Sequence, residues 1–280
     1  SFYSGDTHPG TLFSGVQQNL SIFISRKCDI PTLWTSDFIR FADGQGERAV
    51  VFDAKVAFVK NEASRFGGDV MDWVFKLGNT LENGILEKFL SRNQVKYFAN
   101  NERSAACSFY HNVAHYWVKA FPVAPYFKRA NEAPSISSHY KEVKCLKQDK
   151  LLVSGLLTSS LFYFWYILRS NARDLTYDDV ISFYIDIHGI SGNKYILIQL
   201  EEAIRKLQIS ICKSKQRVVY SKKSGNVTYD QYWISPSKSY IDAVDELLSA
   251  HYGFTEEELD FIINYDSSQR AYSHILQHVA

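Results

Sequence analysis

The sequence contains few cysteines, and they form no pattern. Cys28, Cys107, Cys145 and Cys212 are scattered along the chain, and no C-x-x-C pair occurs. Zinc ribbons and dithiol redox motifs need such pairs, so both classes are excluded. We expect free thiols in a reducing cytoplasm. We expect no signal peptide at the start of the chain.

The chain also lacks an excess of charge, because 31 basic and 30 acidic residues give a formal net charge of +1. Its charges are nevertheless separated along the sequence. Between Ala203 and Tyr229 all charged residues are basic: Arg205, Lys206, Lys213, Lys215, Arg217, Lys222 and Lys223. From Ser237 onward acidic residues outnumber basic ones. This order suggests one face made for an anion, although a solvated helix face explains any single lysine equally well.

Metal-ligand spacing is missing among the eight histidines. His111 and His115 are four residues apart, but the pattern around them is that of strand and loop rather than helix. Each histidine is therefore expected to be a polar loop residue, and we expect no metal site in this chain.

One long apolar run stands out. Leu151–Leu168 has 18 residues without a charge, which is close to the lower limit for a membrane span. Small polar residues interrupt the run, namely Ser154, Gly155, Thr158, Ser159 and Ser160. No second such run exists, so we predict a single buried core helix, capped by Asp149, and no membrane association.

The remaining pattern predicts strands and helices in turn. Short aromatic-rich strands are expected at 106–110, 116–121 and 140–146, with a loop at 126–138. Amphipathic helices are expected from Asn193 to about Lys215 and at 237–251 and 255–264, the last two joined at Gly253. Thr176 and Thr255 are the expected N-caps of their helices. The fold class predicted is α+β, with a mixed or antiparallel sheet packed by the Leu151–Leu168 helix and followed by a helical tail.

Several segments together resemble a known family. They are HPGTLFSGVQQNLSIFISRK (8–27), YWVKAFPVAPYF (116–127), SISSHYKEV (135–143), LLTSSLFYFWYILRSNARDL (156–175) and SKSYIDAVDELLSAHYGFTEEELDFIINYD (237–266). They resemble the C-terminal part of adenine-N6 DNA methyltransferases of type IIG and type IIS restriction–modification systems. The resemblance covers roughly residues 8–30 and 95–270.

The motifs of methyl transfer are absent from the sequence. The family needs a glycine-rich loop for S-adenosylmethionine and an N-P-P-Y or D-P-P-Y tetrapeptide for the flipped adenine. Gly44-Gln45-Gly46 is a lone G-x-G in a polar loop, and Ala124-Pro125-Tyr126-Phe127 lacks the second proline and the acceptor. We therefore predict no catalytic residue and no cofactor in this chain, while S-adenosylmethionine is expected for a longer parent protein.

The resemblance implies that the chain recognises double-stranded DNA. Arg reads guanine, Asn reads adenine, and Lys, Ser and Thr contact phosphates. Arg169, Asn171 and Arg173 follow the apolar run. Alternatively, this turn is structural and forms an ion pair or a cap on the helix that begins at Thr176. The residues predicted to bind DNA are Lys119, Lys128, Arg129, Ser137, Ser138, His139, Lys141, Arg169, Asn171, Arg173, Lys213, Lys215, Arg217, Lys222 and Lys223.

The prediction is thus a DNA target-recognition module in a prokaryotic cytoplasm, partnered by double-stranded DNA and by the methyltransferase catalytic domain of the same longer chain. Residues 1–60 would be a remnant of that domain, 61–235 the target-recognition domain and 236–280 the helical tail. Two alternatives remain open. One is a divergent Mg²⁺-dependent nuclease using Asp53 and Lys55, and the other is a non-catalytic scaffold whose acidic tail docks another subunit.

Overall fold

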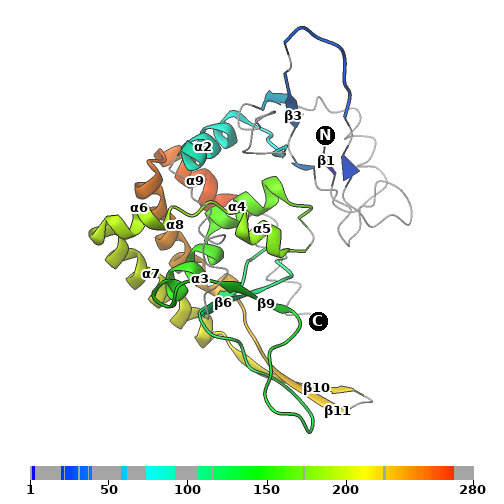
Figure 1. Cartoon of the computed structure of the whole chain (residues 1–280), viewed down its shortest axis with the longest axis vertical. Coiled ribbons are helices and arrows are strands. Elements are labelled where there is room, and N and C mark those ends of the chain that lie inside the picture. Colours follow the sequence, from blue (N-terminus) through cyan, green and yellow to red (C-terminus); the bar gives the residue numbers. More distant parts are fainter. Residues whose placement is uncertain are drawn as a thin grey trace. The chain divides into compact units, whose positions relative to one another are not determined.

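The chain has an α+β fold that divides into two compact units (Figure 1). The computed structural model describes residues 2–3, 20–21, 23–30, 32–36, 38–39, 58–61, 74–91, 106–114, 116–172, 174–222 and 225–267. The first unit comprises Ser1–Phe89 and Tyr166–Arg173, and the second comprises Leu90–Trp165 and Asp174–Ala280. This division follows the packing of the chain and does not test the three functional segments expected from the sequence. Those segments, 1–60, 61–235 and 236–280, stay a prediction.

The first unit contains small sheets and a helix. Its elements are β1 (Phe2–Tyr3), β2 (Leu20–Ser21), β3 (Trp34–Ser36), β4 (Phe38–Ile39), β5 (Phe58–Lys60) and α2 (Thr80–Ser91). Strand β1 pairs antiparallel with β2 and parallel with β4, while β3 pairs antiparallel with β5. The β2-β1-β4 sheet is therefore mixed, and the β3-β5 sheet is antiparallel.

Side-chain amides and a carboxylate bind these pieces of the first unit together. Asn61 Nδ2 donates to Thr35 Oγ1 at 3.2 Å and to the Phe75 carbonyl at 2.8 Å. At the start of α2, Asn79 Oδ1 accepts from the Glu82 backbone N–H at 3.0 Å, and the Glu82 carboxylate accepts from Gly78 and Asn79. This reciprocal capping satisfies backbone N–H groups that the first turn of a helix leaves without a partner.

Among its described residues, the second unit contains two three-stranded antiparallel sheets, six complete α-helices and the first part of a seventh, α4, whose last residues, Tyr166–Arg169, belong to the first unit. One sheet has the order β7-β6-β9: Ala120–Phe121, Cys107–His111 and Tyr140–Lys144. The other has the order β10-β11-β8: Gln216–Lys222, Gly225–Gln231 and Phe127–Arg129. The helices are α3 (Lys150–Thr158), α4 (Ser160–Arg169), α5 (Tyr177–Ile181), α6 (Ile187–Gly192), α7 (Lys194–Lys213), α8 (Lys238–Tyr252) and α9 (Glu256–Asn264). Two short 3-10 helices, Lys147–Asp149 and Ser235–Ser237, precede α3 and α8.

The predicted single helix over Leu151–Leu168 is wrong, because Ser159 divides it into α3 and α4. The pieces are bent by 65°. Ser159 has extended backbone angles, and its hydroxyl donates to the Leu156 carbonyl and accepts from the Phe162 N–H. Hydroxyls compete in this way with helical hydrogen bonding. Asp149 occupies the N-cap position of α3, but its side chain makes no cap hydrogen bond, so that prediction is also wrong.

No single helix in the described part of the chain is long and apolar enough to cross a membrane. Lys147–Thr158 and Ser160–Arg169 meet the length and composition requirements only when they are taken together across their bend.

The core of the second unit lies between the β7-β6-β9 sheet and the helices. Ser108, Tyr110, Ala120 and Val143 share one face of this sheet and are fully buried. That face packs on α3, and the Ser108 hydroxyl donates to the Lys150 carbonyl at 2.9 Å. The apolar face of the sheet and the apolar helix thus cover each other, which is the usual way such a domain buries its core.

Helix α7 crosses α3 at close range. Gly155 of α3 lies against Ile204 of α7, and a Cβ atom at Gly155 would meet the Ile204 side chain at 2.3 Å. Gln208, one turn further along α7, donates to the Ala120 carbonyl at 3.0 Å. The predicted helix from Asn193 is confirmed, and the Asn193 side chain caps it by accepting from the Ile196 N–H.

Other predicted helix ends are also confirmed. Thr176 and Thr255 each form a capping box, with Asp179 and Glu258 respectively. Gly253 ends α8 with φ = 74°, a left-handed conformation that favours glycine.

Three strands of the second unit were not expected from the sequence. The region 126–138, predicted to be a loop, contains β8. The segment after the predicted helix that ends near Lys215, for which no strand was predicted, contains β10 and β11. Of the expected strand at 116–121, only Ala120–Phe121 forms.

Candidate nucleic-acid interface

The structure distributes the residues predicted to bind DNA over both units. Arg169 and Asn171 belong to the first unit. Arg173 and Lys223 lie outside the described residues, and for Lys222 only the backbone is described. The others lie in the second unit: Lys119, Lys128, Arg129, Ser137, Ser138, His139, Lys141, Lys213, Lys215 and Arg217.

The β10-β11-β8 sheet, hereafter the ribbon sheet, carries most of the basic residues that come together. In Figure 1 its β10–β11 hairpin extends away from the helices of the second unit. Thr228 lies opposite Val219 and Lys128, and Val227 lies opposite Tyr220 and Arg129. Since residues that face each other across strands share a side of the sheet, the two basic residues of β8 lie on opposite faces.

One face of the ribbon sheet combines Lys128 and Arg217 with the exposed Val219. The other combines Arg129 with Tyr220, which is 56% exposed. The Arg129 guanidinium also lies over the Phe127 ring, 5.9 Å from its centre. Both faces of this ribbon thus present cationic and apolar groups to solvent.

Asp230 controls two of the predicted phosphate contacts. It faces Arg217 across the hairpin, and its carboxylate is 4% exposed. Arg217 donates to both carboxylate oxygens through Nε and Nη2, and Lys215 Nζ lies 3.5 Å from Oδ2. The hydrogen bond to Asp230 raises the pKa of the Arg217 guanidinium. Asp230 therefore neutralises part of the positive charge of Lys215 and Arg217, which the sequence predicted to be available for phosphate contacts.

The Arg217 guanidinium is also stacked. It lies 3.9 Å from the centre of the Tyr126 ring, and Tyr126 precedes β8. A planar guanidinium suits both a bidentate carboxylate and an aromatic face. Arg217 is thus oriented by two fixed groups, while about half of its side chain remains exposed.

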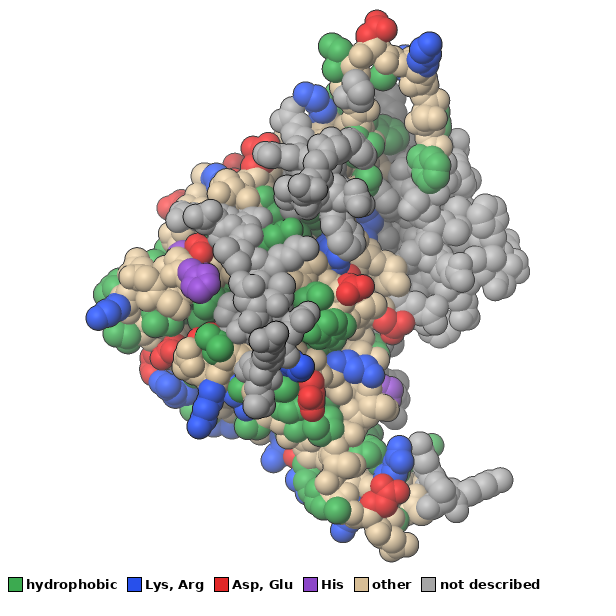
Figure 2. Space-filling model, in the orientation of Figure 1, with side chains coloured by type: hydrophobic (Ala, Val, Ile, Leu, Met, Phe, Trp, Pro, Cys, Tyr) green, Lys and Arg blue, Asp and Glu red, His purple; other side chains and the backbone are tan. Residues whose placement is uncertain are grey.

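Similar pairing occurs on α7. Glu202 lies 3.6 Å from Arg205 and 3.4 Å from Lys206. Both acids, Glu202 and Asp230, lie just outside the stretch in which all charged residues are basic. Figure 2 accordingly shows basic and acidic side chains interspersed on the face in view.

A second cluster lies on the side of the β7-β6-β9 sheet opposite to α3. His111 of β6 pairs with Tyr140 of β9. The backbone N–H of His111 donates to the Lys119 carbonyl, so Lys119 lies beside His111 on its other side, just before β7. The His139 ring stacks on His111 at 5.7 Å, and Tyr140 meets His111 edge-on at 5.0 Å. Lys119 is half-buried, and burial lowers the pKa of its ammonium group, so it is a weaker phosphate ligand than an exposed lysine.

The two sheets of the second unit are joined by aromatic side chains. Phe121 lies 4.5 Å from the Tyr232 ring and 5.9 Å from the Tyr140 ring, measured between ring centres. Burial, and then the charge of Asp230, raise the pKa of Tyr232 to about 12. Its phenol is therefore protonated at neutral pH and can serve as a hydrogen-bond donor.

Ser137, Ser138 and Lys141 occupy the turn and strand beside this cluster. Ser137 Oγ accepts from the His139 N–H at 3.3 Å, and the Ser137 carbonyl accepts from the Tyr140 N–H at 2.9 Å. Ser138 and Lys141 are exposed. Ser137, which was predicted to bind DNA, thus has a structural role in shaping the turn.

Arg169 is poorly placed for reading bases. Its Nε and Nη2 atoms are buried at the end of α4. The following turn is fixed within the first unit, because Lys76 Nζ donates to the Ser170 carbonyl and Ser170 Oγ accepts from the Ala172 N–H. Asn171 is exposed. These contacts favour the structural alternative for this turn, with Asn171 as its accessible polar group.

Metal chemistry finds no support in the described part of the chain, where no group of three or more His, Cys, Asp or Glu side chains is arranged to hold an ion. Asp53 and Lys55, the residues of the nuclease alternative, lie outside the described residues.

Sequence reasoning missed Tyr126, Tyr220 and Asp230. A usable signal was present, because the β-branched and aromatic runs at 218–220 and 227–229 flank Ser224-Gly225, as expected of a hairpin. The stacking of Arg217 on Tyr126 has no such signal, since the two residues are far apart in the chain.

Comparison with known proteins identified no relative of this chain. A scan against models of protein families found no match to the chain. Searches of curated proteins and of solved structures likewise found no match.

Proposed function

We propose that the chain binds duplex DNA through the ribbon sheet. The observation that carries this proposal is an extended antiparallel hairpin with basic and exposed apolar side chains on both faces. The major groove of B-DNA accepts a two-stranded β-ribbon. In this arrangement one face of the ribbon lies toward base edges, and lysines and arginines at its margins contact phosphates.

The exposed groups of the ribbon sheet fit these two tasks. Arg129, on β8 at the edge of the sheet, and Lys128 beside it supply phosphate contacts. Val219 and Asn226 share one face of the ribbon, where Val219 supplies apolar surface that suits the thymine methyl group and Asn226, at the start of β11, supplies an amide suited to adenine. The function proposed is sequence-dependent DNA recognition, as the family resemblance implies, with methyl transfer left to another domain.

The experiment is selection of bound duplexes from a randomised DNA pool, using the 280-residue protein at near-physiological salt without metal or cofactor. We expect enrichment of a short site of several base pairs. Recovery of unselected DNA alone would reduce the proposal to non-specific binding. Absence of retention at moderate salt would overturn it in favour of the scaffold alternative.

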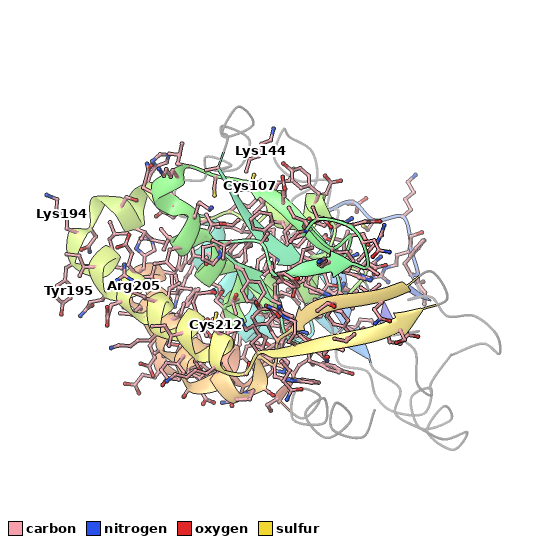
Figure 3. The ribbon with its side chains drawn as sticks, turned by 90° about the horizontal axis from the view of Figure 1, so that it is seen from below. Cys107, Lys144, Lys194, Tyr195, Arg205 and Cys212 are labelled. Carbon is pink, nitrogen blue, oxygen red and sulfur yellow. The ribbon has the colours of Figure 1, made fainter. Side chains whose placement is uncertain are left out.

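Charge removal on β8 tests where DNA binds. Lys128→Gln and Arg129→Gln should each reduce the slope of log K against log salt by about one unit, because each removes one phosphate contact. Lys194→Gln is the matched control, since Lys194 begins α7 at the end of the second unit remote from the hairpin (Figures 1 and 3). Fluorescence anisotropy across a salt series gives all three slopes. Equal slopes for the wild type and both β8 variants would place the DNA elsewhere.

Removing the charge of Asp230 should strengthen DNA binding, whereas removing a charge of β8 should weaken it. Asp230→Asn removes the carboxylate charge while retaining an oxygen that can accept from Arg217. We expect tighter DNA binding by roughly threefold to tenfold at low salt and a steeper salt dependence, because Lys215 and Arg217 are no longer neutralised. The same anisotropy series measures both quantities. Weaker binding in a folded variant would mean that Asp230 serves mainly to orient Arg217 toward the DNA.

A further inference from the structure

Helix α7 has two distinct faces. Its inner face contains Leu200, Ile204, Leu207 and Ile211, all fully buried, and packs against α3 and α8. The residues on its opposite side are Tyr195, Ile198, Glu202, Arg205, Ile209 and Cys212, hereafter the outer stripe. Figure 3 labels Tyr195 and Lys194 at one end of α7, Arg205 along it and Cys212 near the other end.

The outer stripe is more apolar than a solvated helix face. Tyr195 is 71% exposed, Ile198 67% and Ile209 52%, and Cys212 is also exposed. Scattered exposed apolar residues are ordinary, but a row of them along one helix marks an interaction surface. The residues follow one another at intervals of three and four, the spacing that keeps one seam of a helix against a partner helix.

The order of residues along the outer stripe is also complementary to itself when the helix is reversed. A two-fold axis placed between Glu202 and Arg205 brings each residue opposite a complementary one on an antiparallel copy of α7. Ile198 then faces Ile209 of the second copy, and Glu202 faces Arg205 of the second copy. Tyr195 and Cys212 meet at the two ends. Such self-complementarity is what an isologous interface requires.

Charge favours the antiparallel orientation over the parallel one. Within one helix Glu202 already lies 3.6 Å from Arg205. An antiparallel copy adds the same attraction across the interface, so that two acids and two bases alternate at its centre. A parallel copy in register would instead place Glu202 against Glu202 and Arg205 against Arg205, which is unfavourable.

We propose that the outer stripe of α7 is a dimerisation surface that pairs antiparallel with the same stripe of a second copy of this chain. The stripe runs over 18 residues, from Tyr195 to Cys212, and its ends are about 26 Å apart along the helix. A single helix pair of this length is smaller than a standard interface, so the dissociation constant should be about 10–100 µM. This inference does not depend on the proposed DNA binding, because the ribbon sheet and the outer stripe are different surfaces.

Sedimentation equilibrium over a concentration series of the 280-residue protein tests the proposal. The wild type should show a monomer–dimer equilibrium. Ile198→Asp should weaken dimerisation at least tenfold, and Glu202→Arg should weaken it similarly by gathering four like charges at the centre. Glu202→Arg combined with Arg205→Glu should restore wild-type dimerisation, because every pair is then reversed. Circular dichroism checks that each variant, altered only at exposed positions, remains folded.

Cross-linking decides the orientation. In a Cys28→Ser background, a short bismaleimide should join Tyr195→Cys to Cys212 of the second copy. With Tyr195 retained, two Cys212 residues lie at opposite ends of the helix pair, and no cross-linked dimer should form. A wild-type protein that is monomeric at all concentrations, or a dimer unaffected by Ile198→Asp, would overturn the proposal. Cross-linking through Cys212 alone would overturn the antiparallel arrangement.

Discussion

Replacing Asp245 with alanine is expected to lower the free energy of unfolding by about 3 kcal/mol. Asp245 lies on α8 and is 2% exposed. Its two carboxylate oxygens accept from the backbone N–H groups of Ser160 and Leu161, at 3.1 and 3.2 Å, where α4 begins. The substitution leaves both buried donors without this acceptor, and each such loss costs about 1–3 kcal/mol. It also removes a negative charge from the positive end of the helix dipole.

Urea unfolding followed by circular dichroism measures this effect. Asp242→Ala is the control, because Asp242 lies one turn earlier on α8 and only pairs with Lys238 near the surface. It should cost less than about 0.5 kcal/mol. Asp245→Asn should be intermediate, because its amide retains one oxygen and so can replace only one of the two hydrogen bonds. An alanine variant as stable as the control would show that α4 does not depend on this cap.

The second large effect is expected at Gly155. Alanine normally stabilises a helix interior by up to about 1 kcal/mol relative to glycine. Here its Cβ would lie 2.3 Å from Ile204 Cγ1, and Ile204 is fully buried between α7 and α3. Overpacking of this kind costs about 1–3 kcal/mol. We therefore expect Gly155→Ala to destabilise the protein by about 2 kcal/mol in the same unfolding measurement.

A double-mutant cycle separates crowding from other causes. In an Ile204→Ala background the obstacle is gone, so Gly155→Ala should become neutral or stabilising by about 0.5–1 kcal/mol. Gly192→Ala is the matched control, because no atom lies within 4 Å of the Cβ that it would add. A loss of stability that persists in the Ile204→Ala background would refute the close approach of α3 and α7 as its cause.

Local signals predicted the ends of several elements correctly. Thr176, Asn193 and Thr255 cap their helices through their own side chains, and Gly253 ends α8. These features depend on hydrogen bonds or backbone angles within a few residues. For that reason a sequence read in short windows is sufficient to find them.

The break between α3 and α4 could not be predicted in the same way. Its hydroxyl residues were visible, but an apolar run containing serines can also continue as one helix. What stabilises the new N-terminus is Asp245, 85 residues away in sequence from Ser160. The site shows the same limit. Lys215, Arg217 and Asp230 are all visible in the sequence, whereas their pairing depends on the register of β10 and β11.

The sequence by itself determined the α+β class, most of the helices and their caps, because period and capping are local properties. It also indicated where basic residues concentrate. The tertiary structure decided which of those charges are neutralised by Glu202 and Asp230, and that the Nε and Nη2 atoms of Arg169 are buried while Asn171 is exposed. It also decided which face of α7 is exposed to solvent. These outcomes depend on residues that are distant in the chain and adjacent in space, so packing and strand register had to be known first.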